Sequence, residues 1–170
     1  MSIGLKRGTV KLSEYSDDWP NEYEKERLFI MTRAGKYLSR IEHIGSTSVP
    51  GLSAKPIIDI GIEVDSIAEL EMLVKSLPPD AYEYFGERDI LGDYFFAKGS
   101  DEMRTHYIHV SLCESKRLDN YIKFRDALCS NPMLVSEYQN LKRILSSQYH
   151  NDRKSYTELK GQLIAKVINS

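Results

Sequence analysis

A turn of small and hydroxyl-bearing residues lies between two apolar segments in the first half of the chain. Gly45 begins the turn, and Ser46, Thr47 and Ser48 follow it. Backbone N–H groups and hydroxyls in such a turn can bind an anion, and a helix that begins there adds its dipole. Asp59 lies on the next apolar segment, where a carboxylate can hold a divalent metal that bridges to phosphate. The spacing therefore predicts that phosphate and metal meet at one end of a sheet.

Each charged candidate near this turn also has a purely structural interpretation. Asp59 could be a carboxylate at a strand edge that a backbone amide or a lysine satisfies. Lys55 and Arg104 could neutralise phosphate charge, or they could be ion-pair partners at the surface. His43, just before the turn, could pack in the core or contact a ligand. The hydroxyls of the turn lack evident Ser-His-Asp partners, which argues against nucleophilic hydrolysis.

The segment IIDIGIEV predicts a β-strand with two different faces. Pro56 keeps the residue before it extended, and the β-branched residues favour a strand. Side chains alternate along a strand, so one face is apolar and should be core: Ile58, Ile60, Ile62 and Val64. Asp59 and Glu63 share the opposite face with Gly61, where we expect the missing side chain to leave room for a ligand.

A later hairpin supplies another candidate ligand. Residues 93–98 and 104–112 alternate as strands across the turn GSDEM. The mostly apolar face of the second strand should be buried, which turns His109 toward the polar side. By the same argument, His106 is predicted to be a satisfied histidine in the core or at its rim.

Helical spacing and capping residues predict the remaining elements. A helix is expected over 20–38, with a solvated face formed by Glu22, Glu24, Lys25 and Glu26. A short helix or helical turn is expected over 47–54, and Ser66 with Glu69 forms a capping box for another helix. Three helices follow residue 116, the second begun by Asn131 and the third by Asn151 or Asp152. Their apolar stripes are typical packing surfaces, and we assign them no chemistry.

This order of elements predicts an α+β fold, with a small mixed sheet flanked by helices and a C-terminal helical bundle. One domain is expected over residues 1–170, with a core of about 1–113 and C-terminal helices over about 116–170. A net charge of −2 and a pI near 6.1 do not indicate a nucleic-acid or membrane partner. Cys113 and Cys129 lack the spacing of metal ligands, and we expect a cytoplasmic protein.

The arrangement of turn and acid resembles the nucleotidyltransferase superfamily, whose pattern is Gly-Ser on a turn followed by Asp-x-Asp on a strand. More closely, IEHIGSTSVPGLSAKPIIDI resembles the signature of the GrpB family, which has that fold. The likeness covers almost the whole chain, because four further segments match in the expected order: YSDDWPNEYEKE, RTHYIHV, FRDALCSNPMLVSEYQNLK and YTELKGQLI.

The resemblance implies a role for each part of the turn and strand. Gly45 and Ser46 match the superfamily's triphosphate-binding pair, and Asp59 matches its first metal-binding Asp, while the second Asp falls on Gly61. Glu63 lies roughly 13 Å from Asp59 along a strand, at about 3.3 Å per residue, which is too far for easy substitution. Two-metal catalysis needs ions roughly 3.5–4 Å apart.

Two other residues could complete a metal site. His109 is the best positional candidate for the third ligand, although imidazole suits transition ions better than Mg²⁺. Glu42, beside the turn, is the other. The resemblance thus leaves the phosphate half of the site intact and the metal half altered.

Three functional hypotheses follow. The first is an enzyme that transfers a nucleotidyl group from a nucleoside triphosphate to an unknown acceptor, with Mg²⁺ or Mn²⁺ at Asp59 and His109 as second ligand or general base. The second is a catalytically degenerate module that binds a nucleotide or another anionic metabolite. The third is a protein-interaction role of the C-terminal bundle. The acceptor, the preferred base and the oligomeric state are not defined by the sequence.

Overall fold

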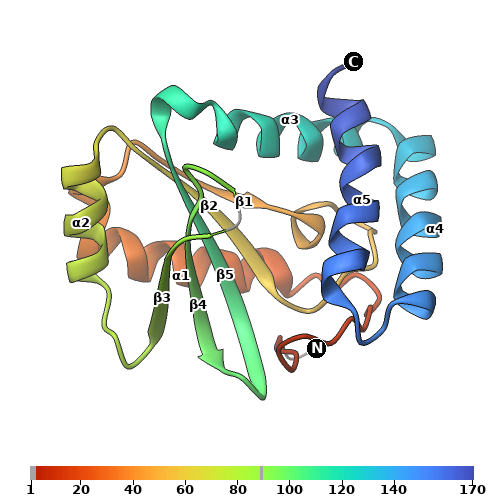
Figure 1. Ribbon diagram of the computed structural model, residues 1–170, viewed down its shortest axis with the longest axis horizontal. Coiled ribbons are helices and arrows are strands. Elements are labelled where there is room, and N and C mark those ends of the chain that lie inside the picture. Colours follow the sequence, from red (N-terminus) through yellow and green to blue (C-terminus); the bar gives the residue numbers. More distant parts are fainter. Residues whose placement is uncertain (1–2, 89) are drawn as a thin grey trace.

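The computed structural model describes residues 3–88 and 90–170, and in these residues a mixed five-stranded sheet is combined with five α-helices. Helix α2 lies at one end of the molecule, α1 runs across the strands of the sheet, and α4 and α5 stand together at the other end (Figure 1). The strands are β1 (Arg40–Ile44), β2 (Ile58–Val64), β3 (Tyr82–Glu87), β4 (Tyr94–Ser100) and β5 (Met103–Leu112). The helices are α1 (Trp19–Ala34), α2 (Ile67–Ser76), α3 (Arg117–Ser130), α4 (Pro132–Gln148) and α5 (Arg153–Ile168). The predicted α+β class is confirmed.

The sheet brings the two predicted site strands together. Its order is β1-β2-β5-β4-β3, and β2 and β5 run parallel while the other neighbours are antiparallel. Asp59 on β2 is paired with Ile44 at the end of β1, so the chain enters the Gly-Ser turn directly beside this acid. On the other side of β2, Gly61 is paired with His109 of β5.

The apolar face of β2 forms the centre of the main core, as predicted. Ile58, Ile60, Ile62 and Val64 are fully buried. They belong to one cluster with Trp19 and Ile30 of α1 and with Leu73 of α2. Burial of this face fixes the register of β2, because a slip by one residue would turn Asp59 into the apolar core.

The first helix differs from the prediction. α1 ends at Ala34, where a 3₁₀ turn, Gly35–Tyr37, replaces the expected last turn. Glu26, which was predicted to be solvated, is only 4% exposed. It accepts hydrogen bonds from the Tyr82 hydroxyl and from Lys98 Nζ, the latter at 2.7 Å. Its position four residues before Ile30 places it on the buried side of the helix, and these two partners compensate for the burial of its charge.

The predicted helix caps are confirmed. Ser66 caps α2 by accepting a hydrogen bond from the Glu69 backbone. Asn131 caps α4, and Asp152 caps α5. None of the described helices is long and apolar enough to cross a membrane.

Helix α3 covers the second face of the sheet at Gly61. A Cβ added to Gly61 would lie 2.5 Å from Leu118 Cδ1 and 3.3 Å from Ile44 Cδ1. Leu118 itself is 1% exposed. The expectation that Gly61 leaves room for a ligand is therefore wrong, because a side chain of α3 already fills that space.

We expect Gly61→Ala to lower the free energy of unfolding by about 1–3 kcal/mol, because the new methyl group must displace Leu118. Leu118→Ala opens the same space, so the two substitutions should be coupled. The double variant should lose less unfolding free energy than the sum of the losses in the two single variants. Urea unfolding of all four proteins measures this coupling. Strictly additive costs would contradict the packing argument.

Candidate functional site

The turn packs directly against the carboxylate of Asp59. Gly45 has φ 71° and ψ −173°, a conformation that is essentially restricted to glycine. A Cβ at this position would lie 2.7 Å from Asp59 Oδ2. The predicted proximity of turn and acid is thus present in the structure, and it depends on the missing side chain.

The hydroxyls of the turn differ in their hydrogen-bond partners. Of the short helix or helical turn expected over 47–54, the structure has a single 3₁₀ turn, Ser46–Ser48. Thr47 is buried, and its Oγ1 lies 3.0 Å from His43 Nε2. Ser48 Oγ donates a 2.5 Å hydrogen bond to the Gly45 carbonyl. These two hydroxyls hold the turn together, which leaves Ser46 as the hydroxyl that can serve a ligand.

His43 anchors the turn from the core side. Its ring stacks on Tyr23 with the centroids 4.7 Å apart. Burial lowers the pKa of His43 to about 4, and the positive charge of Arg125 acts in the same direction. His43 is therefore neutral near pH 7, and the structure places it in packing contacts.

The side chains of Asp59 on β2, His109 on β5 and Asp93 just before β4 lie in a row, with His109 in the middle. His109 Nε2 lies 3.9 Å from Asp59 Oδ1, and His109 Nδ1 lies 3.3 Å from Asp93 Oδ2. Because a carboxylate can only accept, Nδ1–H donates to Asp93, and Nε2 lies on the side of Asp59. Phe95 and Tyr121 flank the imidazole at centroid distances of 5.1 and 5.6 Å.

Asp93 was missed by the sequence interpretation. It is 6% exposed, and its Oδ1 has no hydrogen-bond partner among the residues that the structure describes. The available signal was its position just before β4, since Phe95 on that strand is paired with His109. An acid next to a predicted ligand histidine is a common orienting partner.

Two predicted site residues, Glu42 and Arg104, form ion pairs with other side chains. Glu42 Oε2 accepts a 2.9 Å hydrogen bond from Arg125 Nη1 of α3. Arg104 pairs with Glu83 and Asp101, each at 2.5 Å, near the β4–β5 hairpin. The structure therefore does not bring either side chain to the Gly-Ser turn as a free group.

The donor set does not fit a two-metal centre. Among residues 3–88 and 90–170, no group of three or more His, Cys, Asp and Glu side chains could hold a metal ion. Asp59 and His109 provide two donors, Glu42 is engaged by Arg125, and Gly61 supplies none. Mg²⁺ is usually held by one or two carboxylates together with water and substrate phosphates, so these residues lack the oxygen donors for a pair of ions.

A cluster of lysines lies next to the turn, contributed by segments far apart in the sequence. Lys142 of α4 is 1% exposed and donates to the carbonyl oxygen of Ser53. Burial lowers its pKa to about 6, and the charges of Lys160 and Lys55 add to this effect. Its Nζ lies 4.9 Å from the ring centroid of Tyr138.

The same cluster includes Lys55 and Lys160, which lie over the ring of Tyr156 at 5.8 and 5.2 Å. Burial lowers the pKa of Lys55 to about 7, with further contributions from Lys160 and Arg153, while the charge of Asp59 opposes the shift. We call Lys55, Lys142 and Lys160 the lysine cluster. None of the three has a carboxylate ion-pair partner within the described part of the chain.

Tyr138 connects the lysine cluster to the turn. Burial raises the pKa of its hydroxyl, and a side-chain hydrogen bond with Ser46 opposes the rise. The sequence held a signal for this arrangement, because Tyr138–Lys142 and Tyr156–Lys160 are both Tyr–Lys pairs at i and i+4, on helices to which we had assigned no chemistry.

Comparison with solved structures shows the type of fold. The structure resembles that of the Cid1 poly(U) polymerase with MgGTP bound, with a TM-score of 0.54 and 13% identity over 79% of this chain and 44% of that chain. At this identity the likeness shows the fold alone, which is the nucleotidyltransferase fold that was expected.

The sequence and structure then define the family. The GrpB protein family matches residues 9–170, so the chain belongs to the GrpB family. It is 34% identical to the glutamate-rich protein GrpB of Alkalihalophilus pseudofirmus, over 98% of both chains. The crystal structure of the conserved protein GrpB from Enterococcus faecalis aligns with a TM-score of 0.83 and 28% identity, over 94% of this chain and 98% of that one.

The low pKa of His43 makes stability depend on pH. Between pH 6.5 and about 4 the unfolded chain binds a proton at His43 that the folded protein does not. Stability should therefore fall as the pH falls through this window. In urea unfolding from about pH 7.5 to 4.5, the stability difference between the wild type and His43→Gln should shrink toward low pH. A His150→Gln control, at an exposed position, should keep the pH dependence of the wild type; an identical dependence in all three proteins would refute the assignment.

Proposed function

We propose that this GrpB-family protein binds the phosphates of a nucleoside triphosphate between the Gly-Ser turn and the lysine cluster. The observation that supports the proposal is the buried amine of Lys142, which has a backbone carbonyl but no carboxylate beside it. Burial of a cation is costly unless an opposite charge accompanies it. A polyphosphate bound next to Ser46 supplies that charge, while the backbone and hydroxyl of the turn supply donors.

The fold supports the choice of ligand. The poly(U) polymerase that shares it is described with MgGTP bound. In this protein, Gly45 brings the turn against Asp59, and the hydroxyl of Tyr138 lies beside Ser46. The turn and the C-terminal helices therefore offer two sides of one anion site.

Binding should be coupled to proton uptake. In the free protein at pH 7, Lys142, with a pKa of about 6, is mostly deprotonated, and Lys55, with a pKa of about 7, is partly deprotonated. A bound polyanion raises both pKa values, because it favours the charged amines. The complex then holds more protons than the free protein, so these lysines strengthen binding as the pH falls from about 8 toward 6.

We expect Lys142→Met to weaken nucleoside triphosphate binding about tenfold or more, because the side chain loses its charge but keeps its length. Isothermal titration with ATP, GTP, CTP and UTP at about pH 7.5, in buffers of different ionisation enthalpy, measures both affinity and proton uptake. The variant should also take up fewer protons than the wild type.

Lys166→Met is the matched control for this experiment, because Lys166 is exposed near the end of α5. It should leave affinity and proton uptake unchanged. The proposal fails if none of the four nucleotides binds, or if Lys142→Met binds as tightly as the wild type.

Transfer of the nucleotidyl group to an acceptor is the second candidate function, and the Asp93–His109 pair favours it. His109 Nε2 would take the proton of an acceptor hydroxyl, since Nδ1 donates to Asp93. The acceptor oxygen then bonds to the α-phosphorus, the bond from that phosphorus to the bridging oxygen breaks, and pyrophosphate leaves. The chain supplies no second acid at Gly61, so this candidate depends on Asp59 and His109 alone.

If transfer occurs, Asp59→Asn should reduce pyrophosphate release at least about 100-fold while nucleotide binding changes little, because a group that acts in the transition state affects turnover more than ground-state affinity. A coupled pyrophosphate assay with each nucleotide, with and without added Mg²⁺ or Mn²⁺, measures this. Binding without turnover, equal in the wild type and in Asp59→Asn, would instead identify a catalytically degenerate binding module.

A further inference from the structure

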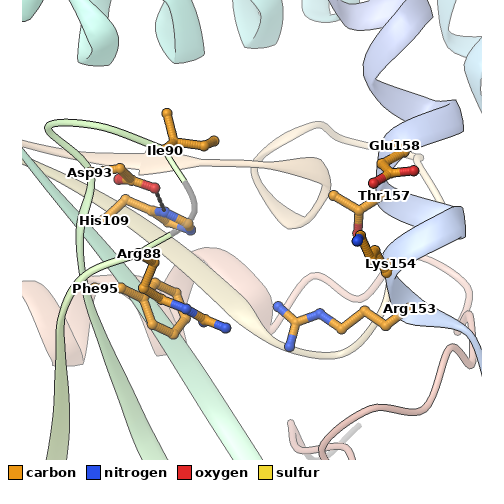
Figure 2. Close-up of a pocket in the computed structure, with 9 residues that line it drawn as sticks. All are labelled: Arg88, Ile90, Asp93, Phe95, His109, Arg153, Lys154, Thr157 and Glu158. Atoms are coloured by element: carbon orange, nitrogen blue, oxygen red, sulfur yellow. Dashed lines mark hydrogen bonds and ion pairs between the residues drawn. The ribbon is translucent and has the colours of Figure 1, made fainter.

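A cavity lies between the sheet and the C-terminal helices. Its volume is about 670 Å³, within the range of small-molecule sites. One wall comes from the β3–β5 region and the other from the first turns of α5 (Figure 2). The lining residues are Arg88, Ile90, Asp93, Phe95, His109, Arg153, Lys154, Thr157 and Glu158. No residue of the Gly-Ser turn or of the lysine cluster is among them, so this cavity is separate from the proposed phosphate site.

Two arginines face each other across this cavity. Figure 2 shows the guanidinium group of Arg88 extending from the sheet side toward that of Arg153, which extends from α5. No acid in the described ranges, 3–88 and 90–170, forms an ion pair with either one. Two like charges that face each other are unfavourable, and an anion between them would remove the repulsion.

Aromatic rings hold both guanidinium groups in place. Arg88 Cζ lies 4.5 Å from the ring centroid of Phe95 and 5.3 Å from that of Phe85. Arg153 Cζ lies 4.9 Å from the ring centroid of Tyr107, and its Nη1 is 3.4 Å from the Tyr107 hydroxyl. A guanidinium group that stacks on a ring keeps its N–H edge free, and that edge matches the oxygens of a carboxylate or phosphate.

The remaining lining gives the cavity a cationic and partly apolar character. Lys154 adds a third positive charge to the lining. The lining also contains two acids, Glu158 on α5 and Asp93, which is engaged with His109. Ile90, which is 49% exposed, offers an apolar surface, whereas Phe95 is buried under the guanidinium group of Arg88. The cavity thus combines oxyanion recognition with contact for a flat or apolar group.

We propose that this cavity is a second binding site, which takes a small molecule with an oxyanion between Arg88 and Arg153 and a flat or apolar body toward Ile90. The site goes beyond nucleotide binding and does not depend on it. Because His109 lines the cavity and its Nε2 is 3.9 Å from Asp59 Oδ1, a molecule bound here lies beside the acid of the Gly-Ser site.

Phenyl phosphate is a suitable probe, because it combines a phosphate with a flat ring, and benzoate and phenol are its carboxylate and neutral counterparts. We expect phenyl phosphate to shift the Nε–Hε signals of Arg88 and Arg153 saturably in ¹H–¹⁵N spectra of the full chain. Arg88→Met and Arg153→Met should each weaken this binding about tenfold or more. Saturable shifts with benzoate as well would extend the site to carboxylates, and their absence would restrict it to phosphates.

Arg33→Met is the matched control, because Arg33 also lies over a phenyl ring, that of Phe29, at 3.5 Å, but on α1. It should leave binding unchanged, and thermal unfolding of each variant checks that the fold is retained. The proposal is overturned if neither anion shifts the two signals, if phenol binds as tightly as phenyl phosphate, or if Arg88→Met binds with unchanged affinity. Loss of phenyl phosphate binding in Lys142→Met but not in Arg88→Met would also overturn it, and would assign the anion to the lysine cluster instead.

Discussion

The contact between Gly45 and the carboxylate of Asp59 determines how the rest of the site can be arranged. Any side chain at Gly45 would overlap with Asp59, and the positive φ of this residue is accessible to glycine at little cost. The pairing of Ile44 with Asp59 in the sheet brings the two together, and His43 and Thr47 hold the turn that follows. An anion on the turn and a cation on the acid would therefore be immediate neighbours.

The two halves of this site are built by different physical means. Beside the turn, amines from three distant segments lie close together, and burial with mutual repulsion lowers the pKa of Lys55 and Lys142. The polyanion that we propose there would restore their positive charge. On the acid side, the imidazole of His109, which Asp93 orients, lies beside Asp59. The described side chains thus support our proposal of a bound polyanion more than a pair of bound metal ions.

Helix α3 explains why the acid side is reduced. Leu118 fills the space above Gly61, Arg125 engages Glu42 and also donates to the His43 carbonyl at 3.0 Å, and Tyr121 packs on His109. Side chains of α3 thus fill the space that an acid at residue 61 would need, and Arg125 pairs with Glu42, the other candidate acid. The Leu118 contact and the Arg125 ion pair both come from α3, so an acid placed at residue 61 would require changes on α3 as well.

The sequence by itself determined those features that depend on residues close together in the chain. The alternation along β2 separated Ile58 and Ile60 from Asp59, the capping residues located the starts of α2, α4 and α5, and the signature around the turn indicated the family. Only the tertiary structure decided which groups stand beside Asp59 and Ser46. The burial of Glu26 and Lys142, the filling of Gly61 and the pairing of Asp93 with His109 all join segments far apart in sequence. Desolvation and charge pairing depend on distance in space, and periodicity along one element carries no information about them.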